Sequence, residues 1–146
     1  MAAGTERWGP ARRWVPRCGG RRHPVCVALI DLDEFKRVND THSHAAGDDV
    51  LRSVAQALKA AVRESDLPAR YGGDEFVVLF PRKTPHLAQQ VCVRIQAAVA
   101  KPRWERWSPA LQVSVSIGFS QAQPGDSGAS LIQRSDVAMF GAKTNA

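Results

Sequence analysis

Short apolar blocks recur along the chain, and their spacing predicts four strands. Residues 25–30 form a continuous apolar run that ends at Asp31 and is too short for a helix, so we expect a strand buried on both faces. A similar run covers residues 75–80, and residues 67–71 precede it as a shorter strand. Residues 113–117 alternate valine or isoleucine with serine, which is typical of a strand with one buried face.

Other blocks space their apolar residues three or four apart, as the buried face of an amphipathic helix requires. Residues 48–62 show this spacing, a shorter helical stretch surrounds residues 34–40, and residues 131–142 outline a last helix. A further helix begins at Thr84, because threonine is a good N-cap and proline follows it at the first helical position. We expect that helix to end before Pro102.

The two central strands are predicted to form a hairpin. Gly72 and Gly73 lie between them, and glycine can adopt the positive φ values that tight turns require. The order β-α-α-β-β-α-β-α then predicts one α/β (α+β) domain, with a central, mainly antiparallel sheet flanked by helices. A length of 146 residues and a hydrophobic content of 44% fit a single core of this kind.

Positive charge is concentrated at the start of the chain. Residues 1–24 hold six arginines and one glutamate, whereas residues 25–146 carry 14 basic and 13 acidic residues. The high isoelectric point therefore describes a tail, and a DNA-binding function loses its main support. Residues 1–24 show neither the alternation of a strand nor the spacing of an amphipathic helix, so we expect an irregular segment there. This segment could be a flexible end or an anion-binding arm, and it precedes a domain over residues 25–146.

Cysteine usage and hydropathy indicate the compartment. Cys18, Cys26 and Cys92 are odd in number and lack paired spacing, which argues against a disulfide framework and a zinc site and favours a reducing environment. No run approaches the roughly 18 apolar residues of a membrane helix, and the arginine-rich start lacks the apolar middle of a secretory signal. We therefore expect a soluble, cytoplasmic protein with no membrane partner.

Two acidic pairs lie where the predicted sheet would bring them together. Asp31 and Asp33 follow the first strand, whereas Asp74 and Glu75 lie at the tip of the hairpin. Each alone could be a solvated turn residue. Four carboxylates close together must retain protons or bind cations, and nucleotide enzymes use aspartate pairs to hold divalent ions beside phosphate. Jointly they predict a metal site.

Spaced motifs across residues 25–143 resemble the GGDEF domains of bacterial diguanylate cyclases. They are DLDEFKRVND at 31–40, a histidine at 44 with Gly-Asp at 47–48, RYGGDEF at 70–76, SVSIG at 114–118 and SDVAMFGAK at 135–143. Several motifs in order are more specific than one pentapeptide. The resemblance implies a palm-like sheet similar to that of nucleotidyl cyclases, and condensation of two GTP to cyclic di-GMP with release of pyrophosphate. Each domain would hold one GTP, so two would face each other as a homodimer.

The resemblance also implies roles for single residues. Asp31 and Asp74 would bind Mg²⁺ (or Mn²⁺) with help from the carbonyl of Leu32. Glu75 would lie beside the reacting 3′-hydroxyl, which makes it the catalytic partner of Asp74. The implied substrate contacts are two guanine-reading side chains, two turn glycines and two lysines on the triphosphate: Asn39, Asp48, Gly72, Gly73, Lys36 and Lys143. An amide and a carboxylate suit the guanine edge, and lysines supply positive charge to the transferring phosphate.

A further match concerns regulation by the product. Residues 63–66 read RESD and end six residues before Gly72, where many of these cyclases carry an R-x-x-D site inhibited by cyclic di-GMP. Arginine offers a fork for phosphate, and aspartate accepts hydrogen bonds from guanine. The resemblance therefore assigns Arg63 and Asp66 to that site, with Arg94 as a candidate second arm. An ordinary ion pair at a helix end is the alternative.

Three departures from the family pattern lower the expected activity. Ser43 stands where the family usually has glycine, residues 1–24 do not match the usual D-x-L-T-G-L-x-N-R element, and no arginine follows Lys143 by four residues. We therefore weigh a slow diguanylate cyclase against a module that binds GTP or cyclic di-GMP without useful turnover. The charge distribution argues against a third hypothesis, a nucleic-acid binder.

Overall fold

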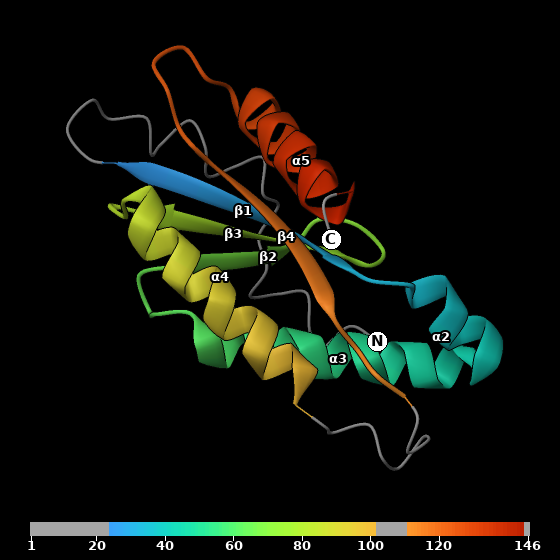
Figure 1. The fold of residues 1–146 in the computed structure, drawn as a ribbon. Coiled ribbons are helices and arrows are strands. Elements are labelled where there is room, and N and C mark those ends of the chain that lie inside the picture. Colours follow the sequence, from blue (N-terminus) through green and yellow to red (C-terminus); the bar gives the residue numbers. More distant parts are fainter. Residues whose placement is uncertain (1–23, 102–110, 145–146) are drawn as a thin grey trace.

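The structure is a computed structural model that describes residues 24–101 and 111–144, the last three by backbone alone. These ranges form eight elements (Figure 1), which are β1 (Val25–Leu32), α2 (Phe35–Thr41), α3 (His44–Ala61), β2 (Leu67–Arg70), β3 (Glu75–Pro81), α4 (Pro85–Ala100), β4 (Val115–Gln121) and α5 (Gly128–Thr144). Their order and the fold class agree with the sequence-based prediction. Of residues 1–24, predicted to be irregular, only Pro24 lies within the described part.

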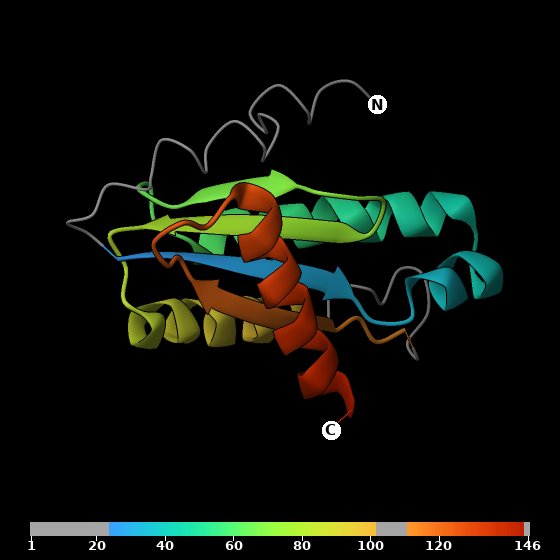
Figure 2. The same ribbon diagram turned by 90° about the horizontal axis from the view of Figure 1, so that it is seen from above.

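The four strands form one antiparallel sheet in the order β2-β3-β1-β4. Helices α3 and α4 cover one face of this sheet, and α5 crosses the other (Figures 1 and 2). The strand β1 is central because its residues 25–30 are apolar throughout and can be buried on both faces, as the sequence predicted. No helix in the described ranges is long and apolar enough to span a membrane.

Alternation along β1 divides the interior into two cores. Cys26, Ala28 and Ile30 point to the side of α3 and α4, where they join the buried residues Phe76 and Phe80 of β3. Intervening residues point to the opposite side and pack beneath α5, in a smaller core made of Val25, Val27, Ala69, Val77, Leu79 and Leu131. The larger core therefore supports the helices that carry the candidate site.

Helix starts follow their N-cap residues. Helix α3 begins at His44, four residues earlier than predicted, because the Ser43 side chain accepts a hydrogen bond from the Ala46 N–H at 3.1 Å. The serine that departs from the family pattern thus acts as a cap. The predicted cap at Thr84 is confirmed, since its hydroxyl accepts from the Leu87 N–H at 3.4 Å.

The hairpin turn differs from its prediction. Neither Gly72 nor Gly73 has a positive φ; among the described glycines only Gly125 does, at 85°. Residues 71–74 separate the strands, and the Glu75 carbonyl accepts hydrogen bonds from the N–H groups of Tyr71 and Gly72, at 2.9 and 3.2 Å. A turn of this length does not require the two positive φ values of a two-residue hairpin.

The strand β4 is shifted toward the C-terminus relative to the predicted 113–117. Its pairing with β1 runs from Val115 to Gln121, because the residues that break the apolar alternation still bond to β1. One of them, Gly118, lies where α5 approaches the sheet closely: a Cβ atom there would overlap the backbone of Ser135 and Met139. Helix packing therefore determines this part of the strand.

Candidate active site

Three carboxylates converge where β1 ends beside the tip of the β2–β3 hairpin. One oxygen from each of Asp31, Asp74 and Glu75 lies within 4.8 Å of the other two. Antiparallel pairing places Asp31 directly opposite Glu75, and the Leu32 N–H donates to the Asp74 carbonyl at 3.1 Å. The sheet and this hydrogen bond therefore hold the three side chains together at one edge.

The fourth carboxylate expected here, that of Asp33, lies outside this group. It accepts hydrogen bonds from the hydroxyls of Ser114, at 2.7 Å, and Ser116, at 2.5 Å. The Asp33 N–H also donates to the Ser114 carbonyl at 2.9 Å. The expectation of four gathered carboxylates is wrong for this residue because, at the end of β1, its backbone and side chain both bond to the residues around the start of β4. Asp33 thereby fixes the strand end that carries Asp31.

The chemistry of the three carboxylates suits a divalent cation. Like charges this close repel, and carboxylate oxygens are the hard ligands that Mg²⁺ and Mn²⁺ prefer. Leu32, predicted to add its carbonyl, has its side chain buried in the core, so only its backbone is available to an ion. Asp31, Asp74 and Glu75 are the described residues that this geometry brings together as candidate ligands.

A pocket of about 450 Å³ adjoins the carboxylates. Its volume is in the range typical of small-molecule sites. Its lining comes from α2, α3 and the hairpin, namely Phe35, Lys36, Asn39, His44, Asp48, Leu51, Arg70, Gly73 and Asp74. The predicted substrate residues Lys36, Asn39, Asp48 and Gly73 are among them, whereas Gly72 is not.

The junction of α2 and α3 positions the two side chains predicted to read guanine. Asn39 lies on α2 and Asp48 on α3, and both line the pocket. Gly47 allows the helices to approach, because a Cβ atom there would overlap the Asn39 side chain and press on Phe35. Glu34, the N-cap residue of α2, has a left-handed backbone with φ 53°, which turns the chain directly from β1 into the helix.

Arg70 is a pocket residue that sequence reasoning did not assign. Its Nε donates to the Gly72 carbonyl at 3.1 Å, and its Nη2 donates to the Gly73 carbonyl at 2.6 Å. These charge-assisted bonds hold the turn that carries Asp74. The sequence did indicate this residue, since Arg70 opens the RYGGDEF motif. The hydrogen bonds from its guanidinium to the turn, however, depend on the geometry of the hairpin.

The residues assigned to product inhibition lie where α3 ends and on α4. The Arg63 side chain is exposed, whereas Asp66 is only 3% exposed. The Asp66 carboxylate accepts from the Arg63 N–H at 2.9 Å and pairs with the Lys83 ammonium at 2.7 Å. Arg94 donates from Nη2 to the Ala61 carbonyl at 2.9 Å. Sequence reasoning missed Lys83, because nothing near it in the chain indicates burial.

Two further predictions concern Lys143 and the cysteines. Lys143 belongs to the last turn of α5, and its side chain lies outside the described part, so its contact with the triphosphate stays a prediction. The described cysteines Cys26 and Cys92 are free and buried, and burial raises their thiol pKa values to about 11 and about 12. Thiols with such pKa values remain protonated and are poor nucleophiles or metal ligands.

Comparisons with known proteins agree with this geometry. The family model "Diguanylate cyclase, GGDEF domain" matches residues 12–146. The chain is 41% identical over 125 residues to the response regulator PleD of Caulobacter vibrioides, covering 84% of this chain and 28% of that protein. It is 36% identical over 128 residues to diguanylate cyclase A of Treponema denticola, covering 87% and 34%. The chain thus spans about a third of the length of these curated relatives.

Solved structures show the same fold. The diguanylate cyclase SiaD from Pseudomonas aeruginosa, in complex with its activator SiaC, superposes with a TM-score of 0.85 at 32% identity, over 93% of this chain and 52% of that chain. The GGDEF domain of DgcB from Caulobacter crescentus, in complex with c-di-GMP, gives a TM-score of 0.78 at 33% identity, over 84% and 74%.

Proposed function

The chain belongs to the GGDEF domain family, and on that basis we propose that it condenses two GTP molecules into cyclic di-GMP with release of pyrophosphate. The observation that carries the proposal is the group of Asp31, Asp74 and Glu75 at the edge of the pocket. Asp74 belongs both to this group and to the pocket lining, so a bound nucleotide would meet the carboxylates.

The carboxylates divide into two roles in this proposal. Asp31 and Asp74 would hold Mg²⁺ (or Mn²⁺) with the carbonyl of Leu32, and the bound ion would neutralise the charge on the phosphates. Glu75 would lie beside the 3′-hydroxyl of GTP, whose oxygen forms a bond to the α-phosphorus of the second GTP as pyrophosphate leaves. The 3′-hydroxyl of the second GTP then attacks the α-phosphorus of the first, and loss of a second pyrophosphate closes the ring.

The pocket residues would orient the nucleotide. Asn39 and Asp48 would bind the guanine edge, because a carboxylate can accept both of its N–H donors and an amide can donate to its carbonyl. Lys36 would contact the triphosphate, as would Lys143 at the end of α5. Arg70 would keep the turn at residues 72 and 73 in place beneath the phosphates.

Turnover in this proposal requires two GTP-loaded domains that face each other. Each association costs translational and rotational entropy, so we propose that the chain by itself is a slow enzyme whose rate per molecule rises with protein concentration. Fusing a dimerising coiled coil ahead of Val25 is expected to raise the rate and to remove its concentration dependence. A fusion that dimerises and binds GTP with Mg²⁺ but forms no cyclic di-GMP would contradict the cyclase proposal.

We further propose that cyclic di-GMP binds this chain near the end of α3 and inhibits it. Support comes from the exposed guanidinium of Arg63, from Arg94 on α4, whose guanidinium reaches the Ala61 carbonyl at the end of α3, and from Asp66, whose carboxylate accepts from the Arg63 N–H. Arg63→Ala should weaken binding of cyclic di-GMP roughly tenfold or more, since a charge-assisted phosphate contact is lost. Calorimetry measures this, and unchanged affinity would place the ligand elsewhere.

One experiment tests the proposed reaction directly. The purified chain is incubated with GTP and Mg²⁺, and the nucleotides are separated by chromatography, with a chelator as the metal-free control. Cyclic di-GMP and pyrophosphate should appear only with the divalent ion. Metal-dependent GTP binding without product, at every protein concentration tested, would identify the chain instead as a nucleotide-binding module.

A further inference from the structure

A buried ion pair lies behind the proposed inhibitory site. Lys83 follows β3, and its ammonium lies 2.7 Å from Oδ1 of Asp66. The exposed fractions of the two side chains are 8% for Lys83 and 0% for Asp66. Lysine and aspartate are seldom buried unless they are paired, so each accounts for the burial of the other.

Burial makes the Asp66 carboxylate inaccessible in this arrangement. One oxygen accepts from the Lys83 ammonium, and the other accepts from the Arg63 N–H at 2.9 Å. An ionised carboxylate has further lone pairs, but a side chain with no exposed surface offers none of them to a ligand. A guanine ring that binds Asp66 must therefore displace something first.

The group best able to move is the side chain of Lys83. Its backbone is fixed, because its N–H donates to the Pro24 carbonyl at 3.1 Å and its carbonyl accepts from the Cys26 thiol at 3.3 Å. Its ammonium lies 5.5 Å from the centre of the Phe80 ring. A four-carbon stem lets a lysine ammonium reach water while its backbone stays in place.

We infer that Lys83 sets the affinity of this site by competing with cyclic di-GMP for Asp66. The inference rests on the proposed binding of cyclic di-GMP at Arg63. In the free chain the ammonium covers and neutralises Asp66, and the exposed Arg63 provides the first contact for a phosphate. Guanine reaches Asp66 only when the ammonium has moved to solvent. The apparent affinity is then reduced by the small fraction of molecules in which Lys83 is displaced.

The first test compares cyclic di-GMP binding by calorimetry in Lys83→Met and in the parent chain. Methionine keeps the apolar stem but removes the competing charge, so binding should tighten roughly tenfold. The gain should vanish when Asp66→Asn is added, and the matched control Lys101→Met, which removes an exposed ammonium, should bind like the parent. A folded Lys83→Met chain with unchanged or weaker affinity would overturn the inference.

A second test uses the unaltered chain, because Lys83→Met leaves a buried carboxylate without its counter-charge and lowers stability. Lysine acetylation is followed by mass spectrometry with and without saturating cyclic di-GMP. Lys83 should be protected in the free chain and reactive in the complex, and at a ligand concentration near the parent's Kd it should be more protected in Arg63→Ala than in the parent. Continued protection at saturation would refute the inference, even if the chain forms cyclic di-GMP from GTP. Exposure of Lys83 in a chain without turnover would refute only the cyclase proposal.

Discussion

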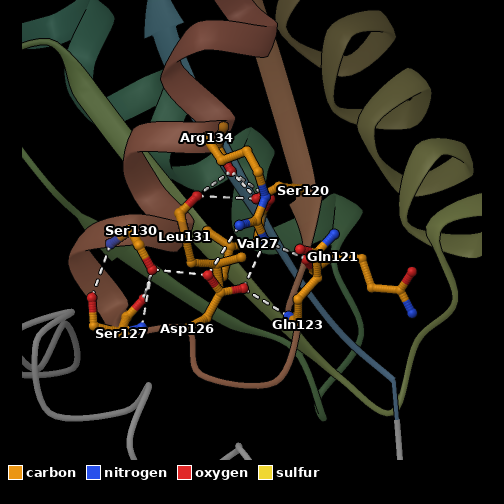
Figure 3. Close-up of polar contacts among 10 residues, drawn as sticks. Val27, Ser120, Gln121, Gln123, Asp126, Ser127, Ser130, Leu131 and Arg134 are labelled. Atoms are coloured by element: carbon orange, nitrogen blue, oxygen red, sulfur yellow. Dashed lines mark hydrogen bonds and ion pairs between the residues drawn. The ribbon is translucent and has the colours of Figure 1, made fainter.

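Acidic side chains occur in two contrasting groups at the sheet. In one group, Asp31, Asp74 and Glu75 bring three negative charges together. In the other, between β4 and α5, the Asp126 carboxylate accepts from both terminal nitrogens of Arg134, at 3.0 and 2.7 Å (Figure 3). Arg134 supplies the counter-charge of the second group, and a cation would stabilise the like charges that the first group gathers.

The region around Asp126 is a structural support. Besides Arg134, its carboxylate accepts from the Ser130 hydroxyl at 2.9 Å and the Gln123 N–H at 2.7 Å, and Arg134 also donates to the Gln121 carbonyl at 2.6 Å (Figure 3). Hydrogen bonds from Arg134, and then from Gln123, hold the pKa of Asp126 well below its ordinary range. Carboxylates with such partners stabilise a fold, whereas carboxylates that face one another are candidate cation ligands.

Packing distinguishes the two regions as clearly as charge does. Ser120 of β4 and Ser135 of α5 are buried where the helix meets the sheet, with their hydroxyls 2.7 Å apart, and both hydroxyls lie within hydrogen-bond distance of the Leu131 carbonyl. Ser135 also donates to the Val27 carbonyl of β1 at 3.2 Å. Helix α5 is therefore joined closely to the sheet, whereas α2, α3 and the hairpin leave a pocket between them.

The largest effect should come from the acidic group. Asp74→Ala is expected to reduce formation of cyclic di-GMP by a factor on the order of 1000, because a proposed metal ligand at the pocket is lost, and to leave the melting temperature almost unchanged. Turnover and circular dichroism measure the two quantities. Glu64→Ala, which removes an exposed carboxylate that does not line the pocket, is the matched control and should keep its activity. Parental activity in Asp74→Ala would rule out the metal role.

The closely packed region should respond through stability instead. Gly118→Ala would place a Cβ atom against the backbone of Ser135 and Met139, and we expect it to lower the free energy of unfolding by about 3 kcal/mol. Gly141→Ala on α5 is the control, since the added Cβ would meet no atom within 4 Å and the substitution should raise stability by a few tenths to about 1 kcal/mol. Urea denaturation measures both. Equal stabilities would contradict the close approach of α5.

Local patterns were enough to predict most of the fold. The apolar run at 25–30, the N-cap at Thr84 and the order of the elements came from short-range spacing, and each agrees with the structure. The predicted start of α3 was four residues too late, and the predicted strand at 113–117 began two residues and ended four residues too early. A capping hydroxyl at Ser43 and the approach of α5 at Gly118 determine those boundaries, and neither has a periodic signal.

The part of the candidate site that lies at the strand ends and the hairpin turn could be predicted from the sequence. Placing Asp31 at the end of β1 and Asp74 at a turn was enough to foresee that they meet. The partners of Asp33 and Asp66 were not foreseeable, because Ser116 and Lys83 are distant in the chain and approach only through tertiary packing. Sequence spacing indicates which carboxylates lie close together, but it does not reveal the hydrogen-bond or ion-pair partners that tertiary packing brings to Asp33 and Asp66.

A smaller effect is expected from the arginine that holds the hairpin turn. Arg70→Met removes two charge-assisted hydrogen bonds to the carbonyls of Gly72 and Gly73, and it should lower the cyclase rate roughly tenfold by letting Asp74 move relative to the nucleotide. Initial rates over a range of GTP concentrations give kcat and KM. Arg52→Met removes an exposed arginine of α3 and is the control. If both variants keep parental rates, Arg70 does not position the turn.

The smallest effect concerns the support region and should depend on pH. Because the folded state lowers the pKa of Asp126 below its ordinary 3.8, the stabilisation is complete above about pH 4 and is lost as the pH falls toward the folded-state pKa. Arg134→Gln should therefore lower the free energy of unfolding by about 1 kcal/mol at pH 7, and by progressively less below pH 4. Arg37→Gln breaks a pair with Glu34 in which both side chains are about three-quarters exposed, so its cost should be a few tenths of a kcal/mol at most. Urea denaturation between pH 7 and pH 3 compares the two variants with the parent chain. An Arg134→Gln penalty that stays constant down to pH 3 would show that the arginine acts through packing and not through the charge of Asp126.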